Sequence, residues 1–218
     1  MTTPIVIVGA GGFGREAHDV IEAINEAAGA EVWRFQGFID DAVHHPELLA
    51  SRGPILGGTD ALATLPPTVR YVIGIGNGRV RRAIDAKATA LGMEAAVLVH
   101  PAATMGRHGI ELAPGTIVCS HVSLTTGIQL GRHVHLNLNV TVGHDAVLED
   151  YATVNPGATI SGNVVIGTEA MIGTNAAIIQ GMTVGARSVI GAAAGVVRPI
   201  PADVVAVGIP AKAIGPSS

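Results

Sequence analysis

Aliphatic residues recur at every sixth position through the second half of the chain. Stepping by six from Leu112, the positions hold Val118, Leu124, Leu130, Leu136, Val142, Leu148, Val154, Ile160, Ile166, Ile172, Ile178, Val184, Ile190 and Val196. A second column lies four residues after the first, from Thr116 to Ile200, and is mostly small or β-branched. A period of six fits neither an α-helix, whose face repeats at about 3.6 residues, nor a plain strand, which alternates at two. The pattern predicts a short strand and a tight turn, repeated along the chain.

Three such strands make one triangular coil of eighteen residues, and stacked coils pair as parallel strands. Each coil buries its aliphatic residues only by stacking on its neighbours, as in other solenoid proteins. We therefore expect a β-solenoid domain over residues 101–218 with five full coils. A β-solenoid without catalytic activity is the alternative interpretation of the repeat.

Residues 1–100 follow a different pattern, in which buried strands alternate with amphipathic helices. The expected strands are 5–8, 33–39, 71–75 and 95–99, and the expected helices are 15–27 and 79–91. This alternation is typical of a small parallel α/β domain with a Rossmann-like sheet.

A glycine-rich turn follows the first of these strands. Gly9, Gly11 and Gly14 match the spacing of a dinucleotide fingerprint, in which glycines let phosphates approach a helix N-terminus. Asp40 stands at the end of the second strand, where an acidic residue can bind a ribose. One hundred residues are too few for a full dinucleotide domain. The turn therefore predicts a site for one nucleotide, with a redox dinucleotide or a purely structural turn as alternatives.

The composition narrows the function classes. Of 218 residues, 48% are hydrophobic and 14% charged, and the net charge of −4 offers no basic surface for nucleic acid or membranes. Aromatic residues make up only 3%, which suits a narrow, repetitive core. The single cysteine, Cys119, excludes an internal disulfide, and residues 1–4 lack the features of a signal peptide. No apolar run reaches the length of a membrane span, so we expect a cytoplasmic protein.

Acyl transfer from a thioester needs a base for the acceptor's proton and donors for the oxyanion. Among the nine histidines, His144 is followed by Asp145, and both occupy turn positions of their hexad. A neighbouring carboxylate would orient the imidazole and raise its basicity. His135 is the fallback base, without an adjacent carboxylate, while His121 and His133 are expected on the solvated surface.

The hexads resemble the [LIV]-[GAED]-x-x-[STAV]-x motif of the hexapeptide-repeat acyltransferases, which implies a left-handed parallel β-helix. The chain as a whole resembles bacterial sugar acetyltransferases of surface-polysaccharide (O-antigen) biosynthesis. These are UDP-4-amino-sugar and GDP-perosamine N-acetyltransferases and sialic acid O-acetyltransferases. The matching segments are residues 8–14, 38–41, 73–77, 136–137, 143–145, 161–164 and 207–212.

This resemblance implies a role for each matching residue. His144 would be the general base, Asp145 its partner, and Asn137 a sugar contact. The nucleotide sugar would be held by Gly11, Gly12, Phe13, Asp40, Asp41, Gly76 and Asn77, and acetyl-CoA by Gly162, Ala192, Ala193 and Lys212. Acetyl-CoA would be the co-substrate, with no metal, in a homotrimer whose active sites lie between subunits. Some relatives carry a histidine that holds the acetyl carbonyl where this chain has Thr153, so here a backbone N–H or Asn155 would hold the oxyanion. Some also carry a histidine in the first glycine turn, where this chain has Phe13, so the nucleotide contacts and the identity of the nucleotide base would differ.

The leading hypothesis is transfer of acetyl to the 4-amino group of a UDP- or GDP-linked 4-amino-4,6-dideoxysugar. O-acetylation of sialic acid is the nearest alternative, and a covalent acetyl-enzyme on Cys119 is a variant of the chemistry. A zinc carbonic anhydrase on the same β-helix would need His121, His135 and His144 to converge between subunits. A nucleotide-binding scaffold without catalysis is the remaining class.

Overall fold

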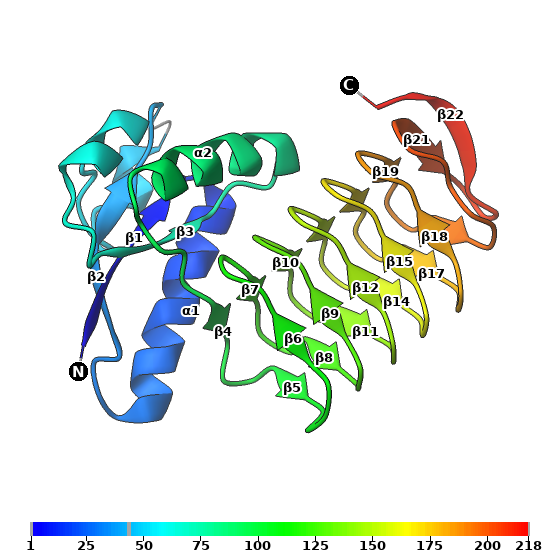
Figure 1. The fold of residues 1–218 in the computed structure, drawn as a ribbon, viewed down its shortest axis with the longest axis horizontal. Helices are drawn as coiled ribbons and strands as arrows, with labels where there is room; N and C mark the ends of the chain where they lie inside the picture. Colours follow the sequence, from blue (N-terminus) through cyan, green and yellow to red (C-terminus); the bar gives the residue numbers. More distant parts are fainter. Residues whose placement is uncertain (1, 43–44, 218) are drawn as a thin grey trace. The chain divides into compact units, whose positions relative to one another are not determined.

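In the computed structural model, which describes residues 2–42 and 45–217, the chain forms two compact units, Met1–Pro101 and Ala102–Ser218 (Figure 1). No helix in the described part of the chain is long and apolar enough to span a membrane.

The first unit is a three-stranded parallel sheet with helices. The strands are ordered β2-β1-β3. Its elements are β1 (Thr3–Val8), α1 (Gly12–Ala28), β2 (Trp33–Ile39), the 3-10 helices η1 (Pro46–Leu48) and η2 (Thr59–Thr64), β3 (Arg70–Ile73), α2 (Gly78–Ala90) and β4 (Leu98–Val99). The first helix begins three residues earlier than expected, so Gly12 and Gly14 belong to its first turn. The expected last strand is reduced to β4, with Ala95 joined to Tyr71 by an isolated bridge.

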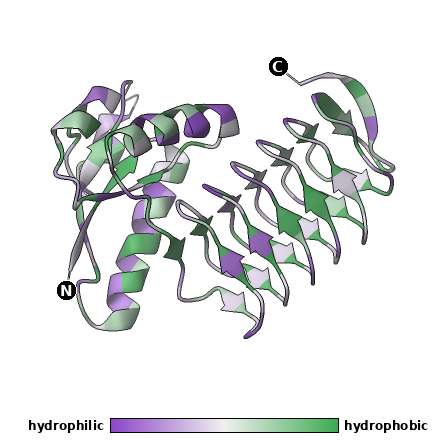
Figure 2. Cartoon of the chain, viewed as in Figure 1, coloured by the Kyte–Doolittle hydropathy of each residue, from purple (hydrophilic) through white to green (hydrophobic). Residues whose placement is uncertain are grey.

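The amphipathic pattern of α1 places it against the sheet. Ala17, Val20 and Ile21 are at most 3% exposed, with the i, i+3, i+4 spacing of one helix face. In Figure 2, hydrophobic and hydrophilic stretches alternate along the ribbon of α1, as an amphipathic helix requires. Gly29 ends the helix in the left-handed conformation, which glycine adopts without steric cost.

The second unit is a stack of short strands, most of them two residues long, in three sheets that are parallel up to the last strand pair (Figure 1). The first sheet runs β7-β10-β13-β16-β19-β21-β22, the second β5-β8-β11-β14-β17-β20, and the third β6-β9-β12-β15-β18. The strands are β5 (Thr104–Met105), β6 (Glu111–Leu112), β7 (Ile117–Val118), β8 (Ser123–Leu124), β9 (Gln129–Leu130), β10 (His135–Leu136), β11 (Thr141–Val142), β12 (Val147–Leu148), β13 (Thr153–Val154), β14 (Thr159–Ile160), β15 (Val165–Ile166), β16 (Met171–Ile172), β17 (Ala177–Ile178), β18 (Thr183–Val184), β19 (Val189–Ile190), β20 (Gly195–Val196), β21 (Val204–Val207) and β22 (Lys212–Pro216). The last two form an antiparallel hairpin.

The hexad columns form the core of this unit. Residues eighteen apart pair directly, as Val142 does with Ile160. From Val118 to Val196 every residue of the first column is at most 3% exposed. Ala146 and Ala158 of the second column are fully buried beside it. Stacking therefore supplies the burial that no single coil achieves.

The solenoid begins one strand earlier than the expected five coils. Met105 pairs with Leu124, nineteen residues on, whereas the coils between Leu112 and Val196 pair at eighteen and the last pairing, Ile190 with Ala206, is at sixteen. This first coil contains one extra residue, so Met105 does not fall on the six-residue register that starts at Leu112.

Each turn also contains one residue in the left-handed conformation. A positive φ recurs at every sixth residue from Gly109 to Ala193, and ten of these positions are not glycine. The conformation costs an L-residue about 1–2 kcal/mol, least for Asn and Asp. The turns define three edges of the solenoid: the first edge contains residues 137–140 and their equivalents, the second 143–146 and the third 149–152.

Candidate functional site

His144 and Asp145 lie together on the second edge, directly after β11 and Gly143. The His144 Nδ1 atom is 2.8 Å from Asp145 Oδ2, and the two side chains are 48% and 61% exposed. Asp145 takes the left-handed conformation of the turn, with φ 59°, and its N–H donates to the Thr126 carbonyl. With Nδ1 donating its proton to the carboxylate, Nε2 carries the lone pair that a base needs.

The absence of a side chain on Gly162 leaves room for the imidazole of His144. A methyl carbon on Gly162, one coil further along the same edge, would lie 2.6 Å from Cε1 and 2.8 Å from Cδ2 of that ring. On Gly143, a methyl carbon would lie 2.5 Å from the Gly162 nitrogen. The structure thus brings His144, Asp145 and Gly162 together, as the sequence predicted for neighbouring coils.

The other predicted residues of this unit lie elsewhere on the chain. Asn137, Ala192 and Ala193 belong to the first edge, and Lys212 is an exposed residue that begins β22. Asn137 is 6% exposed and its Nδ2 donates to the Val154 carbonyl at 3.2 Å. On the same edge, Asn155 Nδ2 donates to the Ile172 carbonyl at 2.9 Å. A single chain does not bring these side chains to His144.

Two of the remaining histidines of the solenoid differ from expectation. His133 was expected on the surface but is fully buried, stacked on Tyr151 with ring centroids 5.9 Å apart. The expectation failed because its ring folds inward over Gly115, where a side chain would collide with it. His135 is also fully buried, which does not suit the fallback base, whereas His121 is exposed as expected.

The second edge continues beyond Gly162 with residues that the sequence analysis missed. Steps of eighteen from His144 lead through Gly162 to the exposed Arg198. Beside this column Ile179 is 45% and Val197 41% exposed, whereas the core column from Val118 to Val196 is at most 3% exposed. The six-residue register that placed Gly162 on this edge also places Ile179, Val197 and Arg198 there.

Five of the predicted nucleotide residues line one cavity in the first unit. It has a volume of about 360 Å³, and its walls include Gly11, Gly12, Phe13, Asp40 and Gly76. Asp40 also holds the turn in shape: Oδ2 accepts the Ala10 N–H at 2.7 Å and Oδ1 accepts the Ala42 N–H at 2.9 Å.

Asp41 and Asn77 are not among the residues that line the cavity, and both have a role in the fold. Asp41 Oδ1 accepts the Thr59 N–H at 2.7 Å, at the start of η2. Asn77 is the N-cap of α2, where its Oδ1 accepts the Val80 N–H at 3.2 Å. Capping therefore explains the place of Asn77 in the sequence motif, and Asp41 joins the turn after β2 to the start of η2.

Arg81 is a residue near this cavity that the sequence did not reveal. It is 0% exposed, and its Nη1 donates to the carbonyls of Ile75 and Gly76, both of which line the cavity. An arginine in the first turns of a helix ordinarily indicates a solvated side chain, so no sequence signal points to it.

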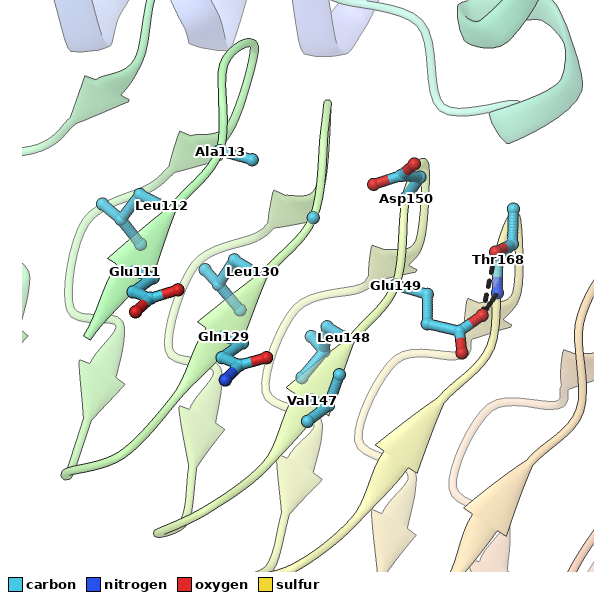
Figure 3. A pocket seen from close by; sticks show the side chains of 11 residues that line it. Glu111, Leu112, Ala113, Gln129, Leu130, Val147, Leu148, Glu149, Asp150 and Thr168 are labelled. Atoms are coloured by element: carbon cyan, nitrogen blue, oxygen red, sulfur yellow. Dashed lines mark hydrogen bonds between the residues drawn. The ribbon is translucent and has the colours of Figure 1, made fainter. Parts of the chain in front are cut away.

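A second hollow lies on the third sheet and the third edge of the solenoid (Figure 3). Its volume is about 520 Å³, and carboxylates of Glu111, Glu149 and Asp150 line it. Glu149 Oε2 accepts the N–H and hydroxyl of Thr168, and Asp150 Oδ1 accepts the Arg132 N–H. An anionic ligand such as a coenzyme phosphate would be repelled there.

One trio of side chains has the spacing of metal ligands in the described residues. Atoms of His18, Asp19 and Glu22 lie within 4.8 Å of one another. The guanidinium of Arg52 already occupies this place, since its Nη1 lies 3.3 Å from His18 Nδ1 and donates to Asp19. Burial lowers the pKa of His18. None of the three histidines considered for zinc belongs to this group.

Comparison with known proteins finds similarity along the whole chain. The PglD N-terminal domain family matches residues 4–88. A GDP-perosamine N-acetyltransferase of Escherichia coli O157:H7 is 30% identical over 163 residues, which cover 72% of this chain and 69% of that protein.

Solved structures match both units. The acetyltransferase domain of PglB from Neisseria gonorrhoeae FA1090, solved also with acetyl coenzyme A, is 32% identical with a TM-score of 0.86, over 98% of this chain and 100% of that one. PerB from Caulobacter crescentus, solved with CoA and GDP-perosamine, is 30% identical with a TM-score of 0.83, over 99% of both chains. The expected fold class, a small parallel α/β domain followed by a left-handed parallel β-helix, is confirmed.

Proposed function

The chain belongs to the family of bacterial nucleotide-sugar N-acetyltransferases, and from this premise we propose that it transfers acetyl from acetyl-CoA to the 4-amino group of a nucleotide-linked 4-amino-4,6-dideoxysugar. The nucleotide is a uridine or guanosine diphosphate. The exposed His144–Asp145 pair, bonded at 2.8 Å, is the observation that carries the proposal.

His144 acts as the general base. The neutral amine of the sugar attacks the thioester carbonyl, and Nε2 of His144 accepts the proton that the amine loses. Asp145 accepts the Nδ1–H bond and stabilises the imidazolium that forms. The tetrahedral intermediate then expels the CoA thiolate, which takes the proton from His144 as it leaves. Cys119 has no part in this, because its side chain is buried at 3% exposure.

Acetyl-CoA lies along the second edge with its thioester at His144 and Gly162. Neighbouring coils of a parallel sheet are about 4.8 Å apart, so Arg198 lies roughly 14 Å from His144 along the axis. The aliphatic Ile179 and Val197 suit the pantetheine arm, and the Arg198 guanidinium suits the phosphates at its far end. Gly162 contributes its backbone N–H to the acetyl end.

The cavity of the first unit holds the nucleotide. Gly11 and Gly12 stand at the N-terminus of α1, where N–H groups and the helix dipole favour phosphate oxygens. Phe13, Asp40 and Gly76 complete its walls. Asp41 and Asn77 contribute indirectly: Asp41 accepts the first N–H of η2, and Asn77 caps α2.

The active enzyme is a homotrimer with its sites between subunits. Asn137, Ala192 and Ala193 lie on the first edge, so they reach acetyl-CoA or the sugar only if a neighbouring chain presents its first edge to the second edge of this one. Asn155 or a backbone N–H of the neighbour then binds the oxyanion, and Lys212 assists at the phosphates. Cytoplasmic location follows from the co-substrate, which is a cytoplasmic metabolite.

The test offers acetyl-CoA with a UDP-linked 4-amino-sugar, with GDP-perosamine and with sialic acid, and follows thiol release. Turnover on an amino-sugar nucleotide, lost in His144→Ala with nucleotide binding intact, is expected. Turnover on sialic acid alone would refute the proposed acceptor, and unchanged activity in His144→Ala would refute the base. Sedimentation at three times the mass of one chain is expected, and a monomer with full activity would refute the shared site.

A further inference from the structure

Two glycine-rich turns, residues 9–14 and residues 74–77, line the nucleotide cavity and lie against each other. A methyl carbon on Gly74 would lie 2.5 Å from Gly14 Cα, and one on Gly9 would lie 2.6 Å from Ile75 Cγ1. Gly9 also has φ 101°, which glycine adopts most readily. Because glycine backbone makes much of this contact, the shape of the cavity depends on how the backbone of residues 74–77 is held.

The side chain of Arg81 forms hydrogen bonds to the backbone of this second turn. Its Nη1 donates to the Ile75 carbonyl at 2.8 Å and to the Gly76 carbonyl at 3.0 Å. The side chain is 0% exposed, the largest fully buried side chain in the described residues. A buried guanidinium remains charged, and charge-assisted hydrogen bonds are stronger than those between neutral groups.

The two carbonyl bonds also orient the amides of the turn. Among the described residues the cis peptide bond is Ile209–Pro210, so the peptides that follow Ile75 and Gly76 are trans. In a trans peptide the N–H points opposite to the C=O. With both carbonyls directed to Arg81, the N–H groups of Gly76 and Asn77 are directed away from it.

We propose that Arg81 is a positioning residue for the nucleotide sugar, which holds the turn between β3 and α2 so that its backbone N–H groups face the nucleotide. The ligand groups recognised are oxygen acceptors of the nucleotide. The inference rests on the proposed function, because it assigns a nucleotide to this cavity. Arg81 acts through the turn and does not touch the reacting atoms.

Arg81→Met tests this by removing the donors while keeping a long side chain. The KM for the nucleotide sugar is expected to rise about 10-fold or more, as the loss of charge-assisted bonds would allow. The KM for acetyl-CoA stays within about twofold, since its site is on the solenoid. Arg81→Lys, which keeps the charge but cannot present a planar fork, gives an intermediate rise.

Tyr71→Phe is the matched control for a purely structural role. The Tyr71 hydroxyl donates to Asp85 at 2.5 Å in the core beneath α2, so its loss also weakens the unit without freeing the cavity turn. This variant is expected to lower Tm and to leave the KM of the nucleotide sugar unchanged. An equal rise of KM in Tyr71→Phe and Arg81→Met, or no rise in Arg81→Met, would overturn the proposal.

Calorimetric binding of UDP and GDP gives a second readout that needs no turnover. Wild-type protein is expected to bind one of them, with affinity reduced in Arg81→Met or, if that variant does not fold, in Arg81→Lys. Nucleotide binding without turnover in the wild type would refute the acetyl transfer but leave this inference to be decided by the variants. Equal affinity in wild type and Arg81→Lys, together with an unchanged KM, would overturn it.

Discussion

Replacing Gly162 by alanine should inactivate the enzyme without unfolding it. The added methyl carbon would lie 2.6 Å from Cε1 and 2.8 Å from Cδ2 of His144, and closer still to Nε2. The obstacle is the end of a movable side chain, so the imidazole moves and the backbone stays. To reach ordinary van der Waals contact the ring must shift by about 1 Å, which disturbs the 2.8 Å bond to Asp145.

The expected magnitude follows from this displacement. A misplacement of about 1 Å at a catalytic group can cost on the order of 10²-fold in rate, or about 2.7 kcal/mol of transition-state stabilisation. The loss of the exposed His144–Asp145 hydrogen bond, on the order of 0.5–1 kcal/mol, is offset by the stiffer unfolded chain that alanine brings, about 0.4–1 kcal/mol. Stability should therefore change little while kcat falls, and the KM of the nucleotide sugar should stay as it is.

Steady-state kinetics and thermal unfolding measure the two quantities. Gly215→Ala is the neutral control, because a methyl carbon there meets nothing within 4 Å. Gly167→Ala is the opposite control: its methyl carbon would lie 2.6 Å from the Ala186 backbone nitrogen, so it should lower Tm. A Gly162→Ala enzyme with wild-type kcat would refute the placement of His144 as base. A large loss of Tm would instead show that the backbone yields.

Three further outcomes are expected. Arg198→Ala should raise the KM of acetyl-CoA by about 10-fold, which is the scale of one charge-assisted phosphate contact, and leave the KM of the nucleotide sugar unchanged. An equal KM of acetyl-CoA in wild type and variant would exclude Arg198 from the coenzyme site. Burial lowers the pKa of His18 in the folded protein, so as the pH falls the unfolded chain binds a proton on this histidine first. The free energy of unfolding should therefore decrease as the pH falls through about 6.5. Urea unfolding at pH 7.5 and 5.5 should show a smaller decrease in His18→Gln than in the wild type. His121 has φ 59° on the solvated surface, so His121→Gly should stabilise the solenoid by up to about 1 kcal/mol, whereas His121→Ala, which keeps the conformational cost, should not.

The hexad register was predictable because it is a one-dimensional property of the chain. A residue at Val142 can be buried only if Leu124 and Ile160 stack on it, so equal spacing in sequence becomes equal spacing in space. The same reasoning predicted that Gly162 lies one coil beyond His144. It failed at the first coil, where one extra residue shifts Met105 out of the count.

The burial of polar side chains was not predictable in this way. His133 and His121 both occupy left-handed turn positions, yet His133 folds over Gly115 and is buried while His121 is exposed. The difference depends on which residues the adjacent coils present, and a hexad count does not contain that information.

From sequence alone, the six-residue period predicted the solenoid and the edge where His144 meets Asp145, and the alternation of strands and helices predicted the α/β unit. Periodicity is sufficient for this because backbone hydrogen bonding and apolar burial repeat with it. Only the tertiary structure showed that Asp41 bonds the start of η2 and that Asn77 caps α2. It also showed that Arg81, which no sequence pattern indicated, donates to the carbonyls of the cavity turn. It also decided that Asn137 and Ala192 lie on an edge other than that of His144. These depend on directions of individual side chains and carbonyls, which only packing determines.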